Sequence, residues 1–341
     1  MQLVTDKAAG IQQDAVVENR SGYVVGVDVG GTNLRMTLAD MTGTPLIKWS
    51  TSTVGLRGPD PVIDLIVDGV RKLLTKAAAA PEALKSVAVG VPGVTNTKDG
   101  VVIATSYLMG WRNVPLRTLL MNGFHIPCAV DNDVNLAAIG ENWAGAAKGS
   151  QDFVFLAIGT GIGAGIVLNG HPYRGSCWGA GEIGYMLLPG MVSGPGKSHE
   201  PGSLESMIGG EGIREQWRRT WSADKTSLPQ ELTATEIFDQ ALCGEALART
   251  ILRTTATLLA HAIYNISLVL NCSLFVLGGG VGLHPALCDE VQSIANQWNV
   301  RVRPHVVRSA LETEAQMLGA IRTALDTANA NAACGEVVTR S

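Results

Sequence analysis

Apolar residues in the first part of the chain form short runs with the length and composition of buried strands. The runs are Tyr23–Val29, Leu34–Asp40 and Pro45–Thr53, and glycine-containing turns separate them. From Pro61 to Ala80 the apolar residues recur at helical spacing instead. The pattern therefore predicts three successive strands followed by a helix.

Two further strands and a helix are predicted next. Ser86–Val91 is an apolar run that ends at Pro92-Gly93, and Cys128–Asp131 is a second, shorter run. A helical pattern then starts near Asp133 and extends to about Ala146. The sequence thus predicts a strand-to-helix junction at Asp133.

A second copy of the opening unit begins at Phe153. Phe153–Ile158 and Ala164–Leu168 are predicted strands, and Gly159–Gly163 is the turn between them. The two copies of this strand–glycine turn–strand unit span Val24–Leu38 and Phe153–Leu168. The repetition predicts a duplicated α/β fold with two lobes that face each other.

The remaining chain is mostly helical in pattern. Helices are predicted over much of 203–272, a strand at Leu274–Leu277 runs into Gly278-Gly279-Gly280, and the last helical pattern covers about Glu312–Leu325. We expect a mobile tail at 1–21, a small lobe at 22–131 completed by a C-terminal helix at 312–326, a larger lobe at 132–311, and a mobile tail at 327–341.

Composition limits the class of protein. Hydrophobic residues make up 46% and charged residues 16% of the 341 residues, and the 40 glycines indicate many tight turns. The net charge of −4 and the lack of a basic block disfavour nucleic acid as a partner.

The start lacks the apolar core of a signal peptide, and the most apolar long stretch, Thr254–Leu270, is shorter than a typical membrane span. The six scattered cysteines form no C-x-x-C pair, and we interpret them as reduced thiols of a cytoplasmic protein.

Both predicted hairpin turns are rich in glycine: Gly30-Gly31-Thr32 in the first copy and Gly159-Thr160-Gly161 in the second. Turn geometry alone can require glycine, because glycine adopts positive φ without steric cost. The alternative is anion binding, in which backbone N–H groups with no side chain in the way surround phosphate oxygens. Asp28, at the end of the preceding strand, can hold a hydrated Mg²⁺ beside those phosphates. Two such turns and one well-placed Asp favour phosphate binding.

Other nucleotide-binding motifs do not fit. The sequence contains no G-x-x-x-x-G-K-[ST] string, so a Walker loop is excluded. Gly163 leads into a predicted strand, whereas a Rossmann fingerprint leads into a helix. Gly278-Gly279-Gly280 is a third glycine turn after a strand, and in a two-lobed protein its backbone could lie against adenine or ribose.

The segment Asp131-Asn132-Asp133-Val134-Asn135 places four polar residues at the strand-to-helix junction. One of them is expected to be the helix N-cap, because Asp and Asn are preferred there. Phosphoryl transfer to an alcohol also needs one carboxylate that orients the hydroxyl and accepts its proton. Asp133 is our candidate for this general base, and Asn132 for hydrogen bonds to sugar hydroxyls.

Glu182 and Glu205 lie in glycine-rich segments, Gly179–Gly184 and Gly202–Glu205. Each of them alone is expected to be a surface carboxylate. The flanking glycines favour the alternative, in which each Glu lies on a loop that packs closely against its surroundings, such as a ligand.

Together these motifs resemble the ROK family of sugar kinases, named for repressors, open reading frames and kinases. The resemblance covers about residues 23–326. It rests on Val27–Asn33, Val89–Gly93, Asn132–Asn135, Gly159–Gly170, Gly175 and Ala180–Gly184. It implies an α/β fold of two actin-like ATPase (ribonuclease H-like) lobes with a central cleft, and ATP and Mg²⁺ as cofactors. It also implies a homodimer that phosphorylates a hexose, usually at the 6-hydroxyl.

The resemblance implies a role for each matching residue. Asp133 would be the general base. Asn132, Asp133, Glu182 and Glu205 would bind the sugar, with Gly93 close to it. ATP and Mg²⁺ would be bound by Asp28, Gly30, Gly31, Thr32, Asn33, Gly159, Thr160, Gly161, Gly279 and Gly280, with Mg²⁺ held by Asp28 and the ATP phosphates.

Two departures from the family concern the sugar side. Tyr185 stands where members commonly have a His that contacts sugar and ligates a structural zinc with three cysteines of the next loop. That loop, 189–203, has no Cys, and His199 alone cannot form a tetrahedral site, so we expect no structural zinc. Tyr107 stands where many members have a sugar-contacting Asn. Either both tyrosines are packing residues, or their hydroxyls line the pocket and favour an acceptor other than plain glucose, or a wider range of acceptors.

Other functions within the family make different demands on the sequence. A repressor needs a DNA-binding helix-turn-helix, whereas about twenty residues without a basic recognition helix precede the first strand. A catalytically silent sugar-binding regulator is the main alternative on the same fold. Polyphosphate as the donor is another, but no long basic channel is evident, which favours ATP.

Overall fold

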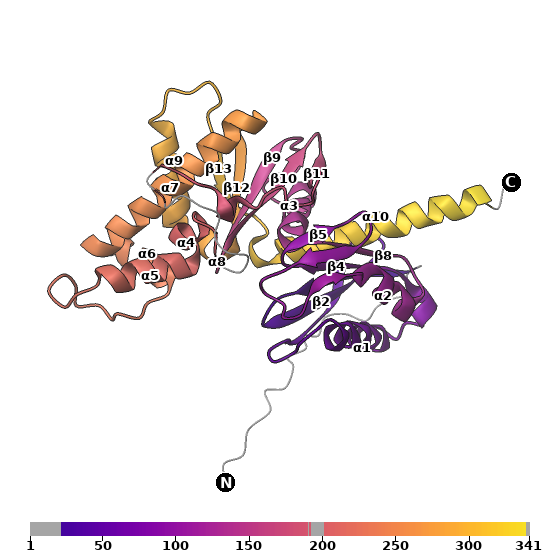
Figure 1. Cartoon of the computed structure of the whole chain (residues 1–341). Helices are drawn as coiled ribbons and strands as arrows, with labels where there is room; N and C mark the ends of the chain where they lie inside the picture. The colour runs from indigo at the N-terminus through magenta and orange to yellow at the C-terminus, as the bar shows by residue number, and fades with distance from the viewer. Residues whose placement is uncertain (1–21, 190, 192–200, 339–341) are drawn as a thin grey trace, which may run out of the picture. The chain divides into compact units, whose positions relative to one another are not determined.

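The computed structural model describes residues 22–189, 191 and 201–338 (Figure 1). The predicted tail at 1–21 lies outside the described residues, as do positions 339–341. Within the described ranges, no helix is long and apolar enough to cross a membrane.

The chain divides into two compact units. The first contains the chain up to Gly140 and resumes at Gln316, and the second is Glu141–Ala315. Both divisions lie later than the predicted ones at 131/132 and 311/312. The reason is the close packing of helix α3 (Asp133–Ala144) on the first unit: a Cβ on Gly319 would lie 1.7 Å from the carbonyl oxygen of Leu136. The first turns of α3 therefore belong with the strand that precedes them.

The first unit is built on a five-stranded sheet in the order β3-β2-β1-β4-β8. Its strands are β1 (Tyr23–Val29), β2 (Asn33–Asp40), β3 (Pro45–Ser52), β4 (Leu84–Val91) and β8 (Cys128–Asn132). A smaller sheet contains β5 (Val94–Asn96), β6 (Val101–Ala104) and β7 (Arg112–Val114). The helices are α1 (Asp60–Lys76), η1 (Pro81–Ala83), α2 (Leu116–Phe124) and α10 (Ala315–Val338).

The second unit repeats this sheet in the order β11-β10-β9-β12-β13. Its strands are β9 (Phe153–Ile158), β10 (Ile162–Leu168), β11 (His171–Tyr173), β12 (Leu274–Gly278) and β13 (His305–Arg308). Its helices are η2 (Ile183–Tyr185), α4 (Glu205–Ile208), α5 (Gly210–Thr220), α6 (Ala234–Leu242), α7 (Ala246–Leu270), α8 (Gly279–Gly282), α9 (Pro285–Asn296) and η3 (Glu312–Glu314).

The two sheets share more than their strand order. In each, the first three strands in chain order are antiparallel neighbours, the fourth pairs in parallel with the first, and the fifth pairs in parallel with the fourth. The predicted duplication of an α/β unit is therefore confirmed.

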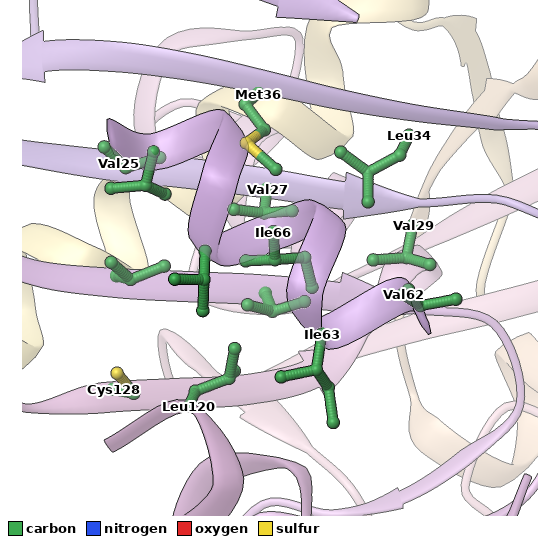
Figure 2. Packing of buried hydrophobic residues seen from close by; sticks show 14 of the residues in the cluster. Val25, Val27, Val29, Leu34, Met36, Val62, Ile63, Ile66, Leu120 and Cys128 are labelled. Atoms are coloured by element: carbon green, nitrogen blue, oxygen red, sulfur yellow. The ribbon is translucent and has the colours of Figure 1, made fainter. Parts of the chain in front are cut away.

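Packing on both faces holds the first sheet between helices. Val25, Val27 and Val29 of β1 lie in the same buried cluster as Ile66 of α1 (Figure 2). The opposite face of β1 meets α10, where a Cβ on Gly26 would lie 3.0 Å from the backbone nitrogen of Ile321. Alternate residues of β1 thus face opposite helical layers, as the two-residue period of a strand requires.

Two expectations for the chain's last third need correction. The glycines at 278–280 do not form a simple turn, because Gly279 begins the short helix α8. Helix α10 does not end at residue 326 but continues to Val338, so the predicted mobile tail is helical over 327–338. That segment is rich in alanine, the best helix former, and has no proline to stop the helix.

Candidate functional site

The first glycine turn joins β1 to β2 and exposes its backbone. The N–H of Gly30 donates to the carbonyl of Asn33 at 2.8 Å, and residues 31–33 are exposed. Thr53 holds the turn from behind: its N–H donates to the carbonyl of Thr32 and its hydroxyl to the carbonyl of Gly30, both at 2.9 Å. A Cβ on Gly31 would lie 3.1 Å from the carbonyl oxygen of Tyr107. The turn is thus fixed mainly through its carbonyls, and its residues 31–33 are exposed, an arrangement that suits a phosphate nest.

Asp28 faces Arg35 directly across the β1–β2 pair. Its Oδ2 accepts hydrogen bonds from Nε of Arg35 at 3.0 Å and from Nη2 at 2.6 Å. The same Nη2 donates to Oε1 of Gln316 at 3.1 Å. The two charge-assisted hydrogen bonds to one oxygen orient the Asp28 carboxylate.

This arrangement allows Asp28 to contact a hydrated Mg²⁺, but only as a minor contributor to binding of the ion. No group in the described part of the chain bonds to Oδ1 of Asp28, so this oxygen can accept from a metal-bound water. Arg35 offsets the charge of Asp28, so Asp28 alone would hold the ion weakly and the nucleotide's phosphates would supply most ligands, as is usual for Mg²⁺. Arg35 was not among the predicted site residues. The signal for it was the hairpin register, which places opposite charges at directly paired positions.

The junction of β8 and α3 positions Asn132 and Asp133. Asn132 is the N-cap of α3: its Oδ1 accepts from the N–H of Val134 at 2.9 Å and of Asn135 at 3.1 Å. Its Nδ2 donates to the carbonyl of Gly93 at 2.9 Å. Asn132 therefore has at most one further N–H to offer a sugar, not the full donor–acceptor pair.

Asp133 is the first residue of α3 and is partly exposed. Its Oδ1 accepts from the N–H of Val134 at 2.9 Å. Asp131, by contrast, is buried and bonds to Asn132 and Asn135, so its role in this segment is structural. The structure thus separates the two aspartates that the sequence places side by side.

Gly93 is required by packing. Its φ is +98°, and a Cβ would lie 2.3 Å from the carbonyl oxygen of Ala104. Because its own carbonyl accepts from Asn132, Gly93 holds the β4–β5 turn against the start of α3. A larger residue here would collide with Ala104 and Thr105.

The second glycine turn is held by the start of helix α5. The N–H of Gly210 donates to the carbonyl of Gly159 at 2.7 Å, and the N–H of Gly159 donates to the carbonyl of Gly161 at 2.9 Å. A Cβ on Gly209 would lie 2.9 Å from the carbonyl oxygen of Thr160. Thr160 is an exposed residue. The N-terminal, electropositive end of α5 thus lies at the turn, which favours an anion there. Gly209 and Gly210 were not among the predicted site residues. The sequence does contain a signal for them, because they are a glycine pair just before a strongly amphipathic helix.

Glu182, Tyr185 and Glu205 come together in the second unit. Glu205, in the first turn of α4, accepts at Oε2 from the N–H of Ile162 at 3.0 Å. Although Glu182 keeps an exposed surface, surrounding protein desolvates its carboxyl group and raises its pKa, and the nearby charge of Glu205 raises it further. Desolvation likewise raises the pKa of Tyr185, with the charges of Glu182 and Glu205 adding to the effect. Tyr185 therefore remains a neutral hydroxyl beside two carboxylates.

Glycines allow this cluster to form. Gly181 has φ +94°, and its Cβ would lie 1.9 Å from the carbonyl oxygen of Ala164 on β10. Likewise, a Cβ on Gly202 would lie 2.1 Å from the carbonyl oxygen of Gly184. The loop that carries Glu182 is thus pressed onto the sheet. The loop that leads into α4 and Glu205 is pressed onto the Glu182 loop in turn.

The pKa of Glu182 makes stability depend on pH. A carboxyl group whose pKa is raised on folding contributes full stability below its unfolded pKa and loses it as the pH rises through the folded value. We expect Glu182→Gln to raise the melting temperature at about pH 8, well above the unfolded pKa of a Glu, and to leave it unchanged below about pH 4. Thermal unfolding across this pH range, with Glu290→Gln on α9 as the control, measures the difference. Equal melting temperatures of variant and wild type at the higher pH would contradict the expectation.

The third glycine segment exposes backbone at the end of β12. Gly279 has φ +77°, and a Cβ there would lie 2.5 Å from the carbonyl oxygen of Ile158. Gly280 is exposed, with nothing within 4 Å of its Cβ position. The open backbone at Gly280 suits the flat face of a nucleoside.

The predicted site residues therefore form separate groups. Glu182, Tyr185 and Glu205 are together in the second unit, which also holds the turns at 159–161 and 279–280. The first unit holds the Asp28 turn, Asn132, Asp133 and Gly93, and Tyr107 packs behind Gly31. The zinc prediction depends on the loop 189–203, which lies mostly outside the described residues. Among the residues with described positions, no three His, Cys, Asp or Glu gather as a metal site.

Comparisons with known proteins identify the family. The sequence model of the ROK family matches residues 24–327. The chain belongs to the ROK family. Among its ROK relatives, the glucokinase of Halalkalibacterium halodurans is 32% identical over 267 residues, which cover 76% of this chain and 80% of that protein.

Solved ROK structures share the fold. A ROK family glucokinase from Streptomyces griseus, in complex with glucose and AMPPNP, has a TM-score of 0.72 at 25% identity and covers 89% of this chain and 99% of its own. A ROK family transcriptional regulator, a homolog of the E. coli MLC protein, has a TM-score of 0.78 at 21% identity and covers 90% of this chain and 79% of its own, and so shows the fold alone. The predicted fold class, with actin-like ATPase units, is confirmed.

Proposed function

We propose that this ROK family member is a sugar kinase that transfers the γ-phosphoryl group of ATP to the 6-hydroxyl of a hexose or hexose derivative. The observation that carries the proposal is Asp133, a partly exposed carboxylate at the start of α3 with one oxygen held by the N–H of Val134. Phosphoryl transfer to an alcohol depends on positioning, charge stabilisation and one such base. Both duplicated glycine turns support the phosphate side.

In this mechanism Asp133 accepts the proton of the sugar hydroxyl as the hydroxyl oxygen bonds to the γ-phosphorus, while the bond from that phosphorus to the β–γ bridging oxygen breaks and ADP leaves with that oxygen. Glu182 and Glu205 accept hydrogen bonds from other hydroxyls of the sugar, and Tyr185 offers a neutral hydroxyl to the same ligand. Backbone amides of the two glycine turns would bind phosphate oxygens of ATP, and Asp28 would hold a water of Mg²⁺. ATP supplies the phosphoryl group, and Mg²⁺ neutralises charge on the phosphates. The proton leaves Asp133 for water after the products separate.

Two observations on relatives support the acceptor and the donor. The Halalkalibacterium halodurans relative is a glucokinase, and the Streptomyces griseus glucokinase binds glucose and the ATP analogue AMPPNP. Tyr107 and Tyr185 replace an Asn and a His that are common in the family, and both are about half exposed, at 49%. We therefore propose an acceptor other than plain glucose, or a broader range of acceptors. Strict preference for glucose would contradict this part of the proposal.

A coupled ADP-release screen tests the function. The panel contains hexoses, amino sugars and N-acetyl sugars, each with and without Mg²⁺. In a parallel series polyphosphate replaces ATP, and the sugar phosphate is measured in place of ADP. We expect Mg²⁺-dependent ADP release that requires one class of sugar. ADP release that no sugar increases would overturn the proposal.

The alternative is a sugar-binding regulator without catalysis. The observation in its favour is the loss of the usual His at Tyr185, because that residue belongs to the sugar side of the site. Calorimetric titration with the same sugars separates the two functions. A regulator binds sugar without releasing ADP, whereas the kinase does both.

A further inference from the structure

His284 is a buried histidine that takes no part in the proposed proton transfer or in phosphate binding. It is 8% exposed and lies between the short helix α8 and helix α9. A buried imidazole needs hydrogen-bond partners for both of its nitrogens. The partners of the two nitrogens therefore indicate what the residue does.

Both ring nitrogens of His284 are occupied. Nδ1 accepts from the N–H of Ala286 at 3.3 Å, so His284 is the N-cap of α9. A nitrogen that accepts carries no hydrogen, so the hydrogen of the neutral imidazole is on Nε2. Nε2 lies 3.1 Å from Oδ1 of Asp239 on α6 and donates to it. A histidine bonded in this way has no nitrogen left for a ligand and acts through the position of its neighbours.

Helix α6 holds the imidazole in two ways. Besides the hydrogen bond to Asp239, the ring of Phe238 meets the imidazole in an edge contact, with centroids 5.5 Å apart and ring planes at 73°. Phe238 is fully buried, whereas the side chain of Asp239 is 64% exposed. The imidazole of His284 is therefore fixed to α6 by one contact in the core and one at the surface.

Helix α8, which precedes His284, cannot hold its own position. It is a single turn, Gly279–Gly282, and three of its four residues are glycine. One helical turn is unstable alone, because fixing its backbone costs more than its first hydrogen bond returns, and glycine makes that cost larger. The position of α8, and of the exposed backbone at Gly280, must therefore come from the segments that flank it.

Contacts at both ends supply that position. At the start, Gly279 packs on β9, where its Cβ would lie 2.5 Å from the carbonyl oxygen of Ile158. At the end, the N–H of His284 donates to the carbonyl of Val281 at 3.1 Å. Val281 is buried, and its Cγ2 would lie 3.4 Å from a Cβ on Gly210, the residue bonded to the second glycine turn. The backbone of His284 thus closes α8 while its side chain is attached to α6.

We infer that His284 is a positioning residue for the nucleotide: its link to α6 fixes α8, and with it the backbone of Gly280 that contacts the nucleoside of ATP. The inference rests on the proposed function and extends it by a residue that acts through its neighbours. Without the link, α8 can shift against β9, and ATP binding weakens because a binding surface depends on its supporting contacts. Glu182 and Glu205 lie on other segments, so sugar binding is unaffected.

The alternative is that His284 only caps α9. That role needs the hydrogen bond from Ala286 but not the one to Asp239. Asparagine separates the two roles, because its side-chain oxygen corresponds to Nδ1 of histidine and it has no atom in the place of Nε2. His284→Asn therefore keeps the cap and removes the link, and Asp239→Ala removes the link from the other side.

The test measures KM for ATP and for the acceptor sugar by coupled ADP release. We expect His284→Asn and Asp239→Ala each to raise the KM for ATP about three- to tenfold, because a small misplacement of binding groups has effects of this size or larger. The KM for sugar and kcat should stay within about twofold of wild type. Asp239→Asn is the conservative rescue, since its side-chain oxygen still accepts from Nε2, and it should keep the wild-type KM for ATP.

Thr233→Ala is the matched control. Thr233 is the N-cap of α6 in the same unit, where its hydroxyl accepts from the N–H of Glu236. Its loss should lower the melting temperature, as the loss of a cap does, and leave the KM for ATP unchanged. Thermal unfolding of every variant verifies folding. Because the side chain of Asp239 is mostly exposed, Asp239→Ala keeps the test decisive if His284→Asn does not fold.

Titration with AMPPNP without sugar makes the same comparison in the absence of catalysis. If the variants bind nucleotide as wild type does, or if Thr233→Ala weakens binding equally, His284 is only a cap and the inference is overturned, while the kinase stands. If His284→Asn and Asp239→Ala weaken AMPPNP binding but no sugar increases ADP release in wild type, the inference holds and the kinase fails. A wild-type protein that binds no AMPPNP would overturn both.

Discussion

Asp133→Asn is expected to lower kcat by about 10²- to 10⁴-fold, the range for loss of a general base. The fold should survive, because the Asn side-chain oxygen can replace Oδ1 of Asp133 as acceptor for the N–H of Val134. The KM for ATP should change little, since the proposed phosphate contacts are made by the glycine turns and not by Asp133. A fall in kcat with an unchanged KM identifies a residue that acts mainly in the transition state.

Asp60→Asn is the matched control for this experiment. Asp60 is also an Asp at the first position of a helix, α1, and is exposed. The control variant should keep the wild-type kcat. Any effect on kcat that replacing an Asp by Asn has at a helix start in general would appear in this variant too. Sugar-dependent ADP release is measured for both variants over background ATP hydrolysis. Wild-type kcat in Asp133→Asn would remove Asp133 from the chemistry.

Glu141→Ala is expected to cost the most stability of any single change considered, about 3–5 kcal/mol. Glu141 is fully buried, and its carboxylate accepts from the hydroxyl of Ser309 and from the N–H of Leu311 at 3.1 Å. The other oxygen accepts from the N–H of Ala146 at 2.6 Å and of Ala310 at 3.4 Å. Alanine would leave these buried donors without an acceptor, and each such group costs about 1–3 kcal/mol.

Glu141 also explains why the effect should be large. It is the first residue of the second unit, and its partners at 309–311 lie just before the point where the chain leaves that unit at 315/316. One carboxylate therefore anchors both segments through which the chain enters and leaves. Gly145 makes room for it, because a Cβ there would lie 2.1 Å from Oε2 of Glu141.

Chemical denaturation of Glu141→Ala, Glu141→Gln and Glu290→Ala measures the effect. Gln keeps one acceptor oxygen but turns an NH₂ group toward an N–H donor, so an intermediate loss of about 1–3 kcal/mol is expected. Glu290 on α9 lies in the same unit, and its replacement should change stability by about 0.5 kcal/mol or less. If Glu141→Ala were as stable as Glu290→Ala, the proposed anchoring would be wrong.

The features that local chemistry dictates could be predicted from the sequence. Strands such as Phe153–Ile158 are continuous apolar runs, and the glycine turns stand out because few other residues adopt the required backbone. The repeat of strand, glycine turn and strand was visible in the linear order. The end of α10 was not, because the alanine-rich segment after residue 326 has no clear stop signal and no strong apolar period.

Contacts between distant residues could not be predicted in the same way. Glu141 seemed an ordinary helical carboxylate, because its partners lie about 170 positions further along the chain. Arg35 needed the β1–β2 register, and the pair Gly209-Gly210 needed the docking of α5 on the second glycine turn. The hydrogen bond of His284 to Asp239 joins residues 45 positions apart.

The sequence by itself determined the duplicated α/β architecture, the position of the glycine turns and the choice of Asp133, because strand period, glycine and helix capping are local properties. The tertiary structure alone decided which polar groups are already occupied. Asn132 caps helix α3 and donates to the carbonyl of Gly93. One oxygen of Asp28 accepts from Arg35, and Glu182 is desolvated beside Glu205. Occupancy and desolvation depend on which atoms the fold brings within a few ångströms, and that information lies in the packing of distant segments.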